Sequence, residues 1–103
     1  MDADKRSKSR ALFVATVEVA ELQSNAYLEG RTSDLSLTGC YFDTLNPLPF
    51  ATEVQVRMTH NNEVFTALGV VVHSQANMGM GIKFTAIEAE QQPVLEQWLA
   101  ETD

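Results

Sequence analysis

The chain has 103 residues, of which 45% are hydrophobic, and a formal net charge of −7. This length predicts one domain with a single core, and the acidic balance argues against a protein that binds a nucleic-acid duplex, because such binding requires many phosphates to be neutralised. A single cysteine excludes an intramolecular disulfide framework, and no apolar run approaches the roughly 20 residues of a membrane-spanning helix.

Charge is distributed unevenly along the chain. The first ten residues hold four of the seven basic residues and only two acidic ones, whereas the rest holds three basic and twelve acidic residues. A basic arm on an acidic body can still bind one small anion. A solvated, disordered basic tail is the alternative, and composition alone leaves it open. The polar start does not resemble a signal peptide, and with one cysteine it favours a cytoplasmic location.

Hydrophobic and polar residues alternate in short segments that are separated by turn residues, which is typical of strands. We expect strands at residues 12–20, 26–33, from 40 onward, 53–60, 63–74 and 79–84. Asp34–Gly39 favours a tight turn after the second strand, and Asn61-Asn62 favours a two-residue hairpin. The aromatic residues expected in the core are Phe13, Phe42, Phe50, Phe65, Phe84 and Trp98.

The C-terminal segment changes to a helical period. Val94, Leu95, Trp98 and Leu99 fall on one face, and Pro93 fits the first turn. A helix this short requires packing on the sheet, with Trp98 as its anchor.

Six antiparallel strands without helical crossovers predict an all-β fold, a small six-stranded antiparallel β-barrel with one C-terminal α-helix. We expect a flexible basic arm at residues 1–10, the barrel at 11–86, and the helix that packs on it at 87–103.

No residue pattern supports catalysis or metal binding. His60 and His73 lack the spacing of metal ligands, and Cys40 has no base or orienting group nearby in the sequence. Gly79-x-Gly81 precedes a strand, so it is not a phosphate-binding loop, and its glycines predict a bulge or a close backbone approach.

Two short motifs carry the functional signal. Arg6 and Arg10 offer two guanidinium groups, which bind phosphates or the O6/N7 edge of guanine. Asp34 offers acceptors for guanine N–H groups, Ser36 offers a hydroxyl for a phosphate, and Gly39 permits a conformation or an approach that a Cβ would block. Together they suit a small ligand with phosphates and a guanine-like base. A β-turn capped by its own Asp and Ser side chains is the alternative explanation of the second motif.

Arg-x-x-x-Arg on an N-terminal arm, followed by Asp-x-Ser-x-x-Gly, resembles the PilZ domain of bacteria. The resemblance covers roughly residues 5–101 and includes the Asn61-Asn62 hairpin, the Gly79–Phe84 ending and the final helix. It implies a receptor for the second messenger cyclic di-GMP, with no metal or other cofactor. The implied ligand-binding residues are Arg6, Arg10, Asp34, Ser36 and Gly39.

Two further residues have secondary roles under this resemblance. Lys5 precedes the arginine pair, where the family's residues influence whether one or two ligands bind, and its identity does not decide the number. Arg31 precedes the second motif and suits either a phosphate contact or a solvated strand surface.

The resemblance implies an adaptor that couples ligand binding to a partner protein. We expect the anionic ligand to neutralise the arginine pair, so that the arm closes on the Asp34–Gly39 segment and forms a surface for the partner. The alternative is a PilZ-type interaction module that acts without nucleotide. Neither interpretation involves nucleic acid or membrane insertion, and both are compatible with a monomer or a homodimer.

Overall fold

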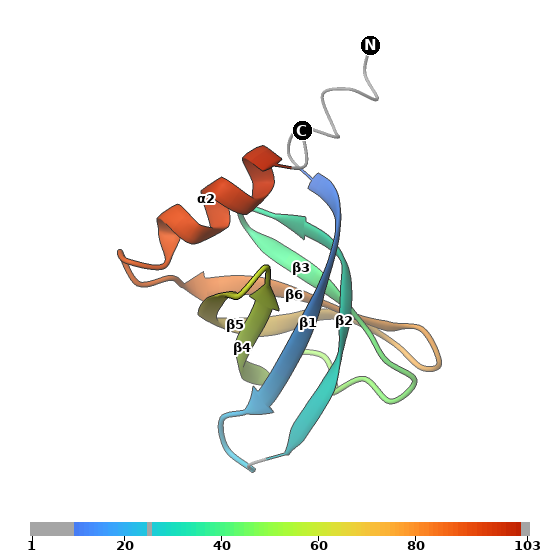
Figure 1. Cartoon of the computed structure of the whole chain (residues 1–103). Helices are drawn as coiled ribbons and strands as arrows, with labels where there is room; N and C mark the ends of the chain where they lie inside the picture. The colour runs from blue at the N-terminus through green and yellow to red at the C-terminus, as the bar shows by residue number, and fades with distance from the viewer. Residues whose placement is uncertain (1–9, 25, 102–103) are drawn as a thin grey trace.

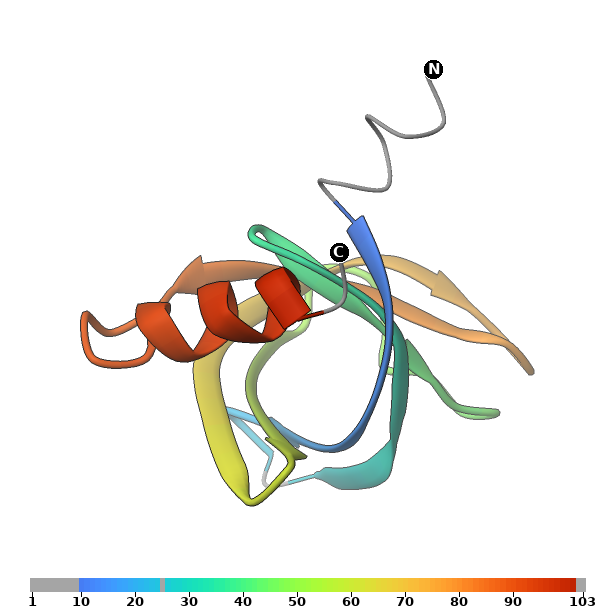
Figure 2. The same ribbon diagram turned by 45° about the horizontal axis from the view of Figure 1, so that its top comes forward.

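The computed structural model describes residues 10–24 and 26–101, and the side chains of residues 15–24, 26–32 and 34–101. Its elements are β1 (Arg10–Glu21), β2 (Tyr27–Ser36), β3 (Gly39–Asp43), β4 (Glu53–His60), β5 (Glu63–Gln75), β6 (Gly79–Ala86) and α2 (Gln92–Glu101). The strands form a closed barrel in the order β1-β2-β3-β6-β5-β4, and all neighbouring strands are antiparallel (Figures 1 and 2). The all-β barrel with one C-terminal helix is therefore confirmed.

The barrel interior is filled by the inward side chains of the alternating segments. In β4, Val54, Val56 and Met58 are fully buried while their neighbours are exposed, as the period of two predicts. The core includes residues from all six strands and α2: Ala15, Val17, Val19, Leu35, Cys40, Phe42, Val54, Val56, Met58, Phe65, Ala67, Val71, Met80, Ile82, Phe84, Leu95 and Trp98.

The β4–β5 hairpin turns at the two asparagines. Asn61 and Asn62 have φ angles of 52° and 67°, in the left-handed region that asparagine tolerates better than most residues. Two consecutive positive φ angles are typical of a type I′ turn, whose twist matches that of the flanking strands. The predicted hairpin is therefore confirmed.

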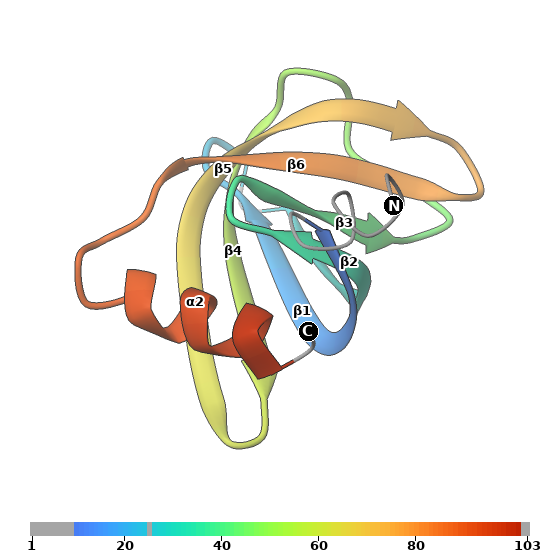
Figure 3. The ribbon, with the colours of Figure 1, turned by 90° about the horizontal axis from the view of Figure 1, so that it is seen from above.

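Helix α2 covers the part of β5 that has no partner on β6. The β5–β6 ladder begins only at Leu68, and the Gln91 side chain accepts a hydrogen bond from the Thr66 amide at 2.9 Å. Seen from above, α2 lies across the barrel at this end (Figure 3). Leu95 and Trp98 are fully buried there.

Trp98 is the anchor of this helix. Its Nε1 donates a hydrogen bond to Glu63 Oε1 at 3.0 Å, and its ring lies 6.2 Å from that of Phe65 and 5.4 Å from that of His60. The indole thus fills the barrel end with its apolar body and satisfies its only donor.

Two sequence predictions about individual segments were wrong. The second strand does not end at Ser33 but continues to Ser36, so Asp34 and Ser36 lie in β2 and only residues 37–38 turn the chain. Phe50 lies in the β3–β4 loop and is 70% exposed, not part of the core. The side chain of Phe13 lies outside the described residues.

Within residues 10–24 and 26–101, no helix has the length and apolar character needed to cross a membrane.

Replacement of Trp98 by alanine tests the anchor. Trp98→Ala should lower the free energy of unfolding by about 3–5 kcal/mol, because it removes a buried ring and leaves a cavity. The measurement is urea denaturation followed by far-UV circular dichroism, since the variant has no tryptophan to report by fluorescence. Gln97→Ala, on the exposed face of α2, is the control and should change stability by less than about 0.5 kcal/mol. Equal stability of the two variants would contradict the anchor role.

Candidate ligand-binding site

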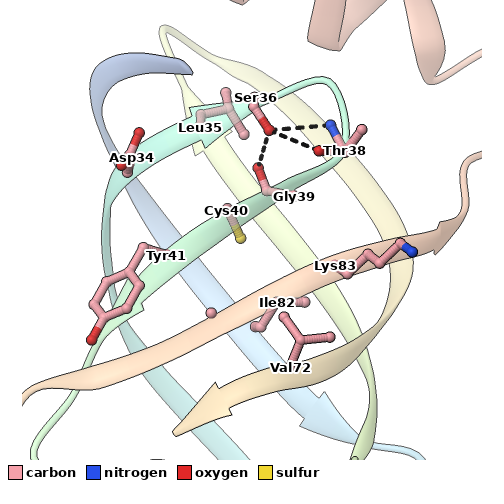
Figure 4. A pocket seen from close by; sticks show the side chains of 11 residues that line it. Asp34, Leu35, Ser36, Thr38, Gly39, Cys40, Tyr41, Val72, Ile82 and Lys83 are labelled. Atoms are coloured by element: carbon pink, nitrogen blue, oxygen red, sulfur yellow. Dashed lines mark hydrogen bonds between the residues drawn. The ribbon is translucent and has the colours of Figure 1, made fainter. Parts of the chain in front are cut away.

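A pocket of about 380 Å³ lies on the outer face of β2, β3 and β6 (Figure 4). This volume is within the range of ligand sites, roughly 300–1,000 Å³. Its lining residues are Asp34, Leu35, Ser36, Thr38, Gly39, Cys40, Tyr41, Val72, Gly81, Ile82 and Lys83. Asp34, Ser36 and Gly39, which the sequence analysis singled out, thus lie together in it.

The hollow arises from two glycines at outward positions. Cys40 and Ile82 point into the core, so their neighbours Gly39 and Gly81 occupy the outer face of β3 and β6. Neither glycine has a side chain to cover the backbone. The neighbouring side chains of Tyr41 and Lys83 line the sides of the pocket.

A β-bulge in β2 turns the second motif toward the pocket. Thr32 pairs with Phe42 and Asp34 pairs with Tyr41, so Ser33 is an extra residue that β3 does not match. Before the bulge, Thr32 points inward and is fully buried; after it, Leu35 points inward. Asp34 and Ser36 therefore point outward, whereas in a regular strand that buries Thr32 both would point into the core.

The buried Thr32 hydroxyl holds this bulge. Its Oγ1 donates to the Tyr41 carbonyl oxygen at 2.6 Å and accepts from the Asp34 amide at 3.4 Å. Among the described residues, no buried side-chain nitrogen or oxygen lacks a hydrogen-bond partner, which includes this hydroxyl. The irregular backbone beside the pocket is thus stabilised from inside the barrel.

Ser36 and Gly39 also have structural roles. Ser36 Oγ accepts a hydrogen bond from the Thr38 amide at 3.2 Å and donates to the Gly39 carbonyl oxygen at 3.4 Å (Figure 4). A Cβ on Gly39 would collide with the Ile82 carbonyl oxygen, so Gly39 permits the close approach of β3 to β6. The second motif therefore shapes the turn as well as lining the pocket.

Cys40, the one cysteine among the lining residues, is buried. Burial raises the pKa of the Cys40 thiol to about 12, although its hydrogen bond with Thr32 lowers it in part. A thiol that stays protonated at neutral pH is a poor nucleophile. The described part of the chain has no group of three or more His, Cys, Asp or Glu side chains that could hold a metal ion.

Comparison with known proteins identifies the family. The family model for the PilZ domain matches residues 4–101, nearly the whole chain. The chain belongs to the PilZ family. No match was found among curated proteins.

Three solved structures share the fold at low sequence identity. The PilZ domain of CeSA, from a cellulose-synthesizing bacterium, matches with a TM-score of 0.69 and 21% identity over 89% of this chain and 95% of that domain. The PilZ domain of YcgR from Escherichia coli, solved with c-di-GMP, has a TM-score of 0.64 and 17% identity over 85% of this chain and 81% of that one. The Bacillus subtilis inhibitor of motility MotI/DgrA has a TM-score of 0.70 and 14% identity over 90% of this chain and 48% of its own.

The N-terminal motif of this PilZ domain lies only partly within the described residues. Arg10 is the first residue of β1 and its backbone pairs with Ser36, although its side chain is not described. Lys5 and Arg6 lie outside the described residues. Arg31 is exposed on β2, on the far side of the bulge, and does not line the pocket.

Eight of the eleven residues that line the PilZ pocket were not predicted as ligand-binding residues, among them Tyr41, Val72, Gly81 and Lys83. Tyr41 and Lys83 could have been placed on the outer face from the period of two, but only the β3–β6 register puts Lys83 beside Gly39. Val72 is an extra residue in a second bulge, where Val71 pairs with Ile82 and His73 with Gly81, so no simple alternation predicts it.

The hydrogen bond that holds the β2 bulge can be tested by removing the Thr32 hydroxyl. Thr32→Val should cost about 1–3 kcal/mol of stability, because the Tyr41 carbonyl and the Asp34 amide each lose a partner inside the protein. Thr32→Ser keeps the hydroxyl and removes one methyl group, so it should cost about 1 kcal/mol or less. Urea denaturation measures both. A Thr32→Val variant as stable as the wild type would show that the hydroxyl does not hold the bulge.

Proposed function

We propose that this PilZ domain binds cyclic di-GMP in the pocket on β2, β3 and β6 and acts as an adaptor that couples the ligand to a partner protein. The observation that carries the proposal is the β1–β2 register. Arg10 lies directly opposite Ser36, so the backbone of the second arginine of the pair lies at the rim of the pocket.

The charges of the pocket support a role for both arginines. Its lining holds one basic residue, Lys83, and one acidic residue, Asp34, so their formal charges cancel. A ligand with two phosphates requires more positive charge than this. Arg6 and Arg10 supply it from the arm, and their guanidinium groups suit phosphates and the guanine edge alike.

The polar groups of the lining match the rest of such a ligand. Asp34 is half-buried, and its carboxylate accepts hydrogen bonds from guanine N1–H and N2–H. Ser36 and Gly39 flank the turn beside it, and the Ser36 hydroxyl would donate to a phosphate oxygen in place of its 3.4 Å hydrogen bond to the Gly39 carbonyl oxygen. The YcgR domain of the same fold was solved with this ligand, which makes cyclic di-GMP the first ligand to test.

A nucleotide-independent interaction module is the second candidate function. Two observations favour it. The first is that Ser36 and Gly39 have roles in the local fold, so their presence alone does not demand a ligand. The loops also carry large exposed hydrophobic side chains, namely Leu45, Phe50 and Met78, which suit a protein partner.

Titration calorimetry with cyclic di-GMP tests the proposed function. Arg10→Ala and Asp34→Ala should each weaken binding about 10- to 100-fold, since each loses charge-assisted hydrogen bonds. Arg57→Ala is the matched control, because Arg57 lies on β4, across the barrel from β3, and pairs with Glu18. The same titration of Arg31→Ala shows whether that residue contributes. Unchanged affinity in both Arg10→Ala and Asp34→Ala would contradict the assignment, and a wild type that does not bind would favour the nucleotide-independent module.

A further inference from the structure

Four of the five glycines have a packing reason within the fold. A Cβ on Gly30 would lie 2.9 Å from Phe42 Cζ, and a Cβ on Gly69 would lie 2.7 Å from Ile82 Cγ2, both inside the barrel. A Cβ on Gly39 or Gly79 would collide with a backbone carbonyl oxygen of the neighbouring strand. The fold therefore excludes side chains at these four positions.

Gly81 is the exception. A Cβ there would lie 3.4 Å from His73 Cβ and 4.0 Å from both Tyr41 Cδ1 and Val72 Cγ2, which are ordinary van der Waals distances. Gly79 is the only glycine with positive φ among the described residues, so the backbone at Gly81 also accepts an L-residue. A glycine in a strand interior is unfavourable, since it costs conformational entropy and packs nothing. The fold itself gives no reason for a glycine here.

The pocket gives a reason. Met80 and Ile82 point into the core, so a side chain at position 81 would point outward. It would lie next to His73, Tyr41 and Val72, the last two of which line the pocket. Only the missing side chain keeps that part of the pocket open.

The strand register sorts the pocket into two rows across the strands. One row holds Asp34, Tyr41 and Gly81, which lie opposite one another on β2, β3 and β6. This row combines the Asp34 carboxylate, the Tyr41 ring and the uncovered backbone of Gly81, and such a combination suits a purine base.

The second row holds the groups that suit a phosphate. Arg10 lies opposite Ser36, and Gly39 lies opposite Lys83, so a hydroxyl and an ammonium group line the same end of the pocket. This sorting places the ligand's base over Gly81 and its phosphates toward Lys83.

We propose that Gly81 is a specificity-determining residue of the pocket: its missing side chain provides clearance for the base of the ligand and is not required by the fold. This inference rests on the proposed function. It predicts that added bulk at position 81 blocks binding and leaves the barrel intact.

The experiment combines titration calorimetry against cyclic di-GMP with thermal melting, on the wild type, Gly81→Ala, Gly81→Val and Thr85→Val, with Gly39→Ala melted as the reference for a structural glycine. Thr85 is exposed on the same strand and does not line the pocket. Thr85→Val therefore introduces a valine into β6, as Gly81→Val does, but without filling the pocket. Gly81→Val should weaken binding at least ~10-fold, with a Tm within about 5 °C of the wild type. Gly81→Ala should have a smaller effect on binding, and Thr85→Val should match the wild type in both measurements.

Two results would overturn the inference while the proposed function stands. One is a Gly81→Val variant that binds as tightly as the wild type. The other is a Gly81→Ala variant whose Tm falls as far as that of Gly39→Ala, because position 81 would then be a structural glycine. A wild type that shows no binding would instead overturn the proposed function, and the clearance role with it.

Discussion

The extra residue in β2 is the constraint on which the rest of the site depends. A regular strand that buries Thr32 would also point Asp34 and Ser36 into the core, where an unpaired carboxylate is costly. The bulge at Ser33 reverses the alternation, so that Leu35 fills the core and the two polar residues face outward. The Thr32 hydroxyl, buried inside the barrel, satisfies the backbone groups that the bulge disturbs. The hydrogen-bonded bulge in β2 thus places polar side chains of this strand on the outer face, where they line the pocket.

Gly39 and Gly81 make different contributions to the shape of that pocket. Gly39 allows β3 to approach β6 closely, and Gly81 leaves the outer face of β6 uncovered next to it. The barrel is closed, so its strands and their outward side chains are held in fixed register around this hollow. In the proposed site, the body of the protein contributes shape and acceptors, and the arginine pair would contribute the positive charge that an anionic ligand needs. This division would reconcile the net charge of −7 with the proposed binding of a phosphate-containing ligand.

Much of the fold could be predicted from the sequence, because the signals were local. The alternation in residues 53–60 and the Asn61-Asn62 turn predict a hairpin that the structure contains, and the apolar face around Trp98 predicts the packed helix. Asp34 and Ser36 were predicted in a turn because their residue types favour turns. The bulge keeps them in the strand instead, and it depends on a tertiary hydrogen bond that no local pattern reveals.

The composition of the pocket was harder to predict than its central motif. Asp34, Ser36 and Gly39 are close in the sequence and were predicted together, whereas Lys83 joins them only through the β3–β6 register. Val72 faces the pocket because of a second bulge, which shifts the alternation of β5 by one residue. The exposed position of Phe50 follows from the loop that carries it, since an aromatic residue just after two prolines gives no indication of which side it will face.

The proposed site for cyclic di-GMP is the outer face of β2, β3 and β6. The most direct measurement is a titration of the ¹⁵N-labelled protein with cyclic di-GMP, followed through the backbone amide signals. The account predicts that the largest shifts occur at Ser36, Gly39, Tyr41, Gly81 and Lys83, with little change in β4. Shifts confined to β4 and α2, or no shifts at saturating ligand, would contradict it.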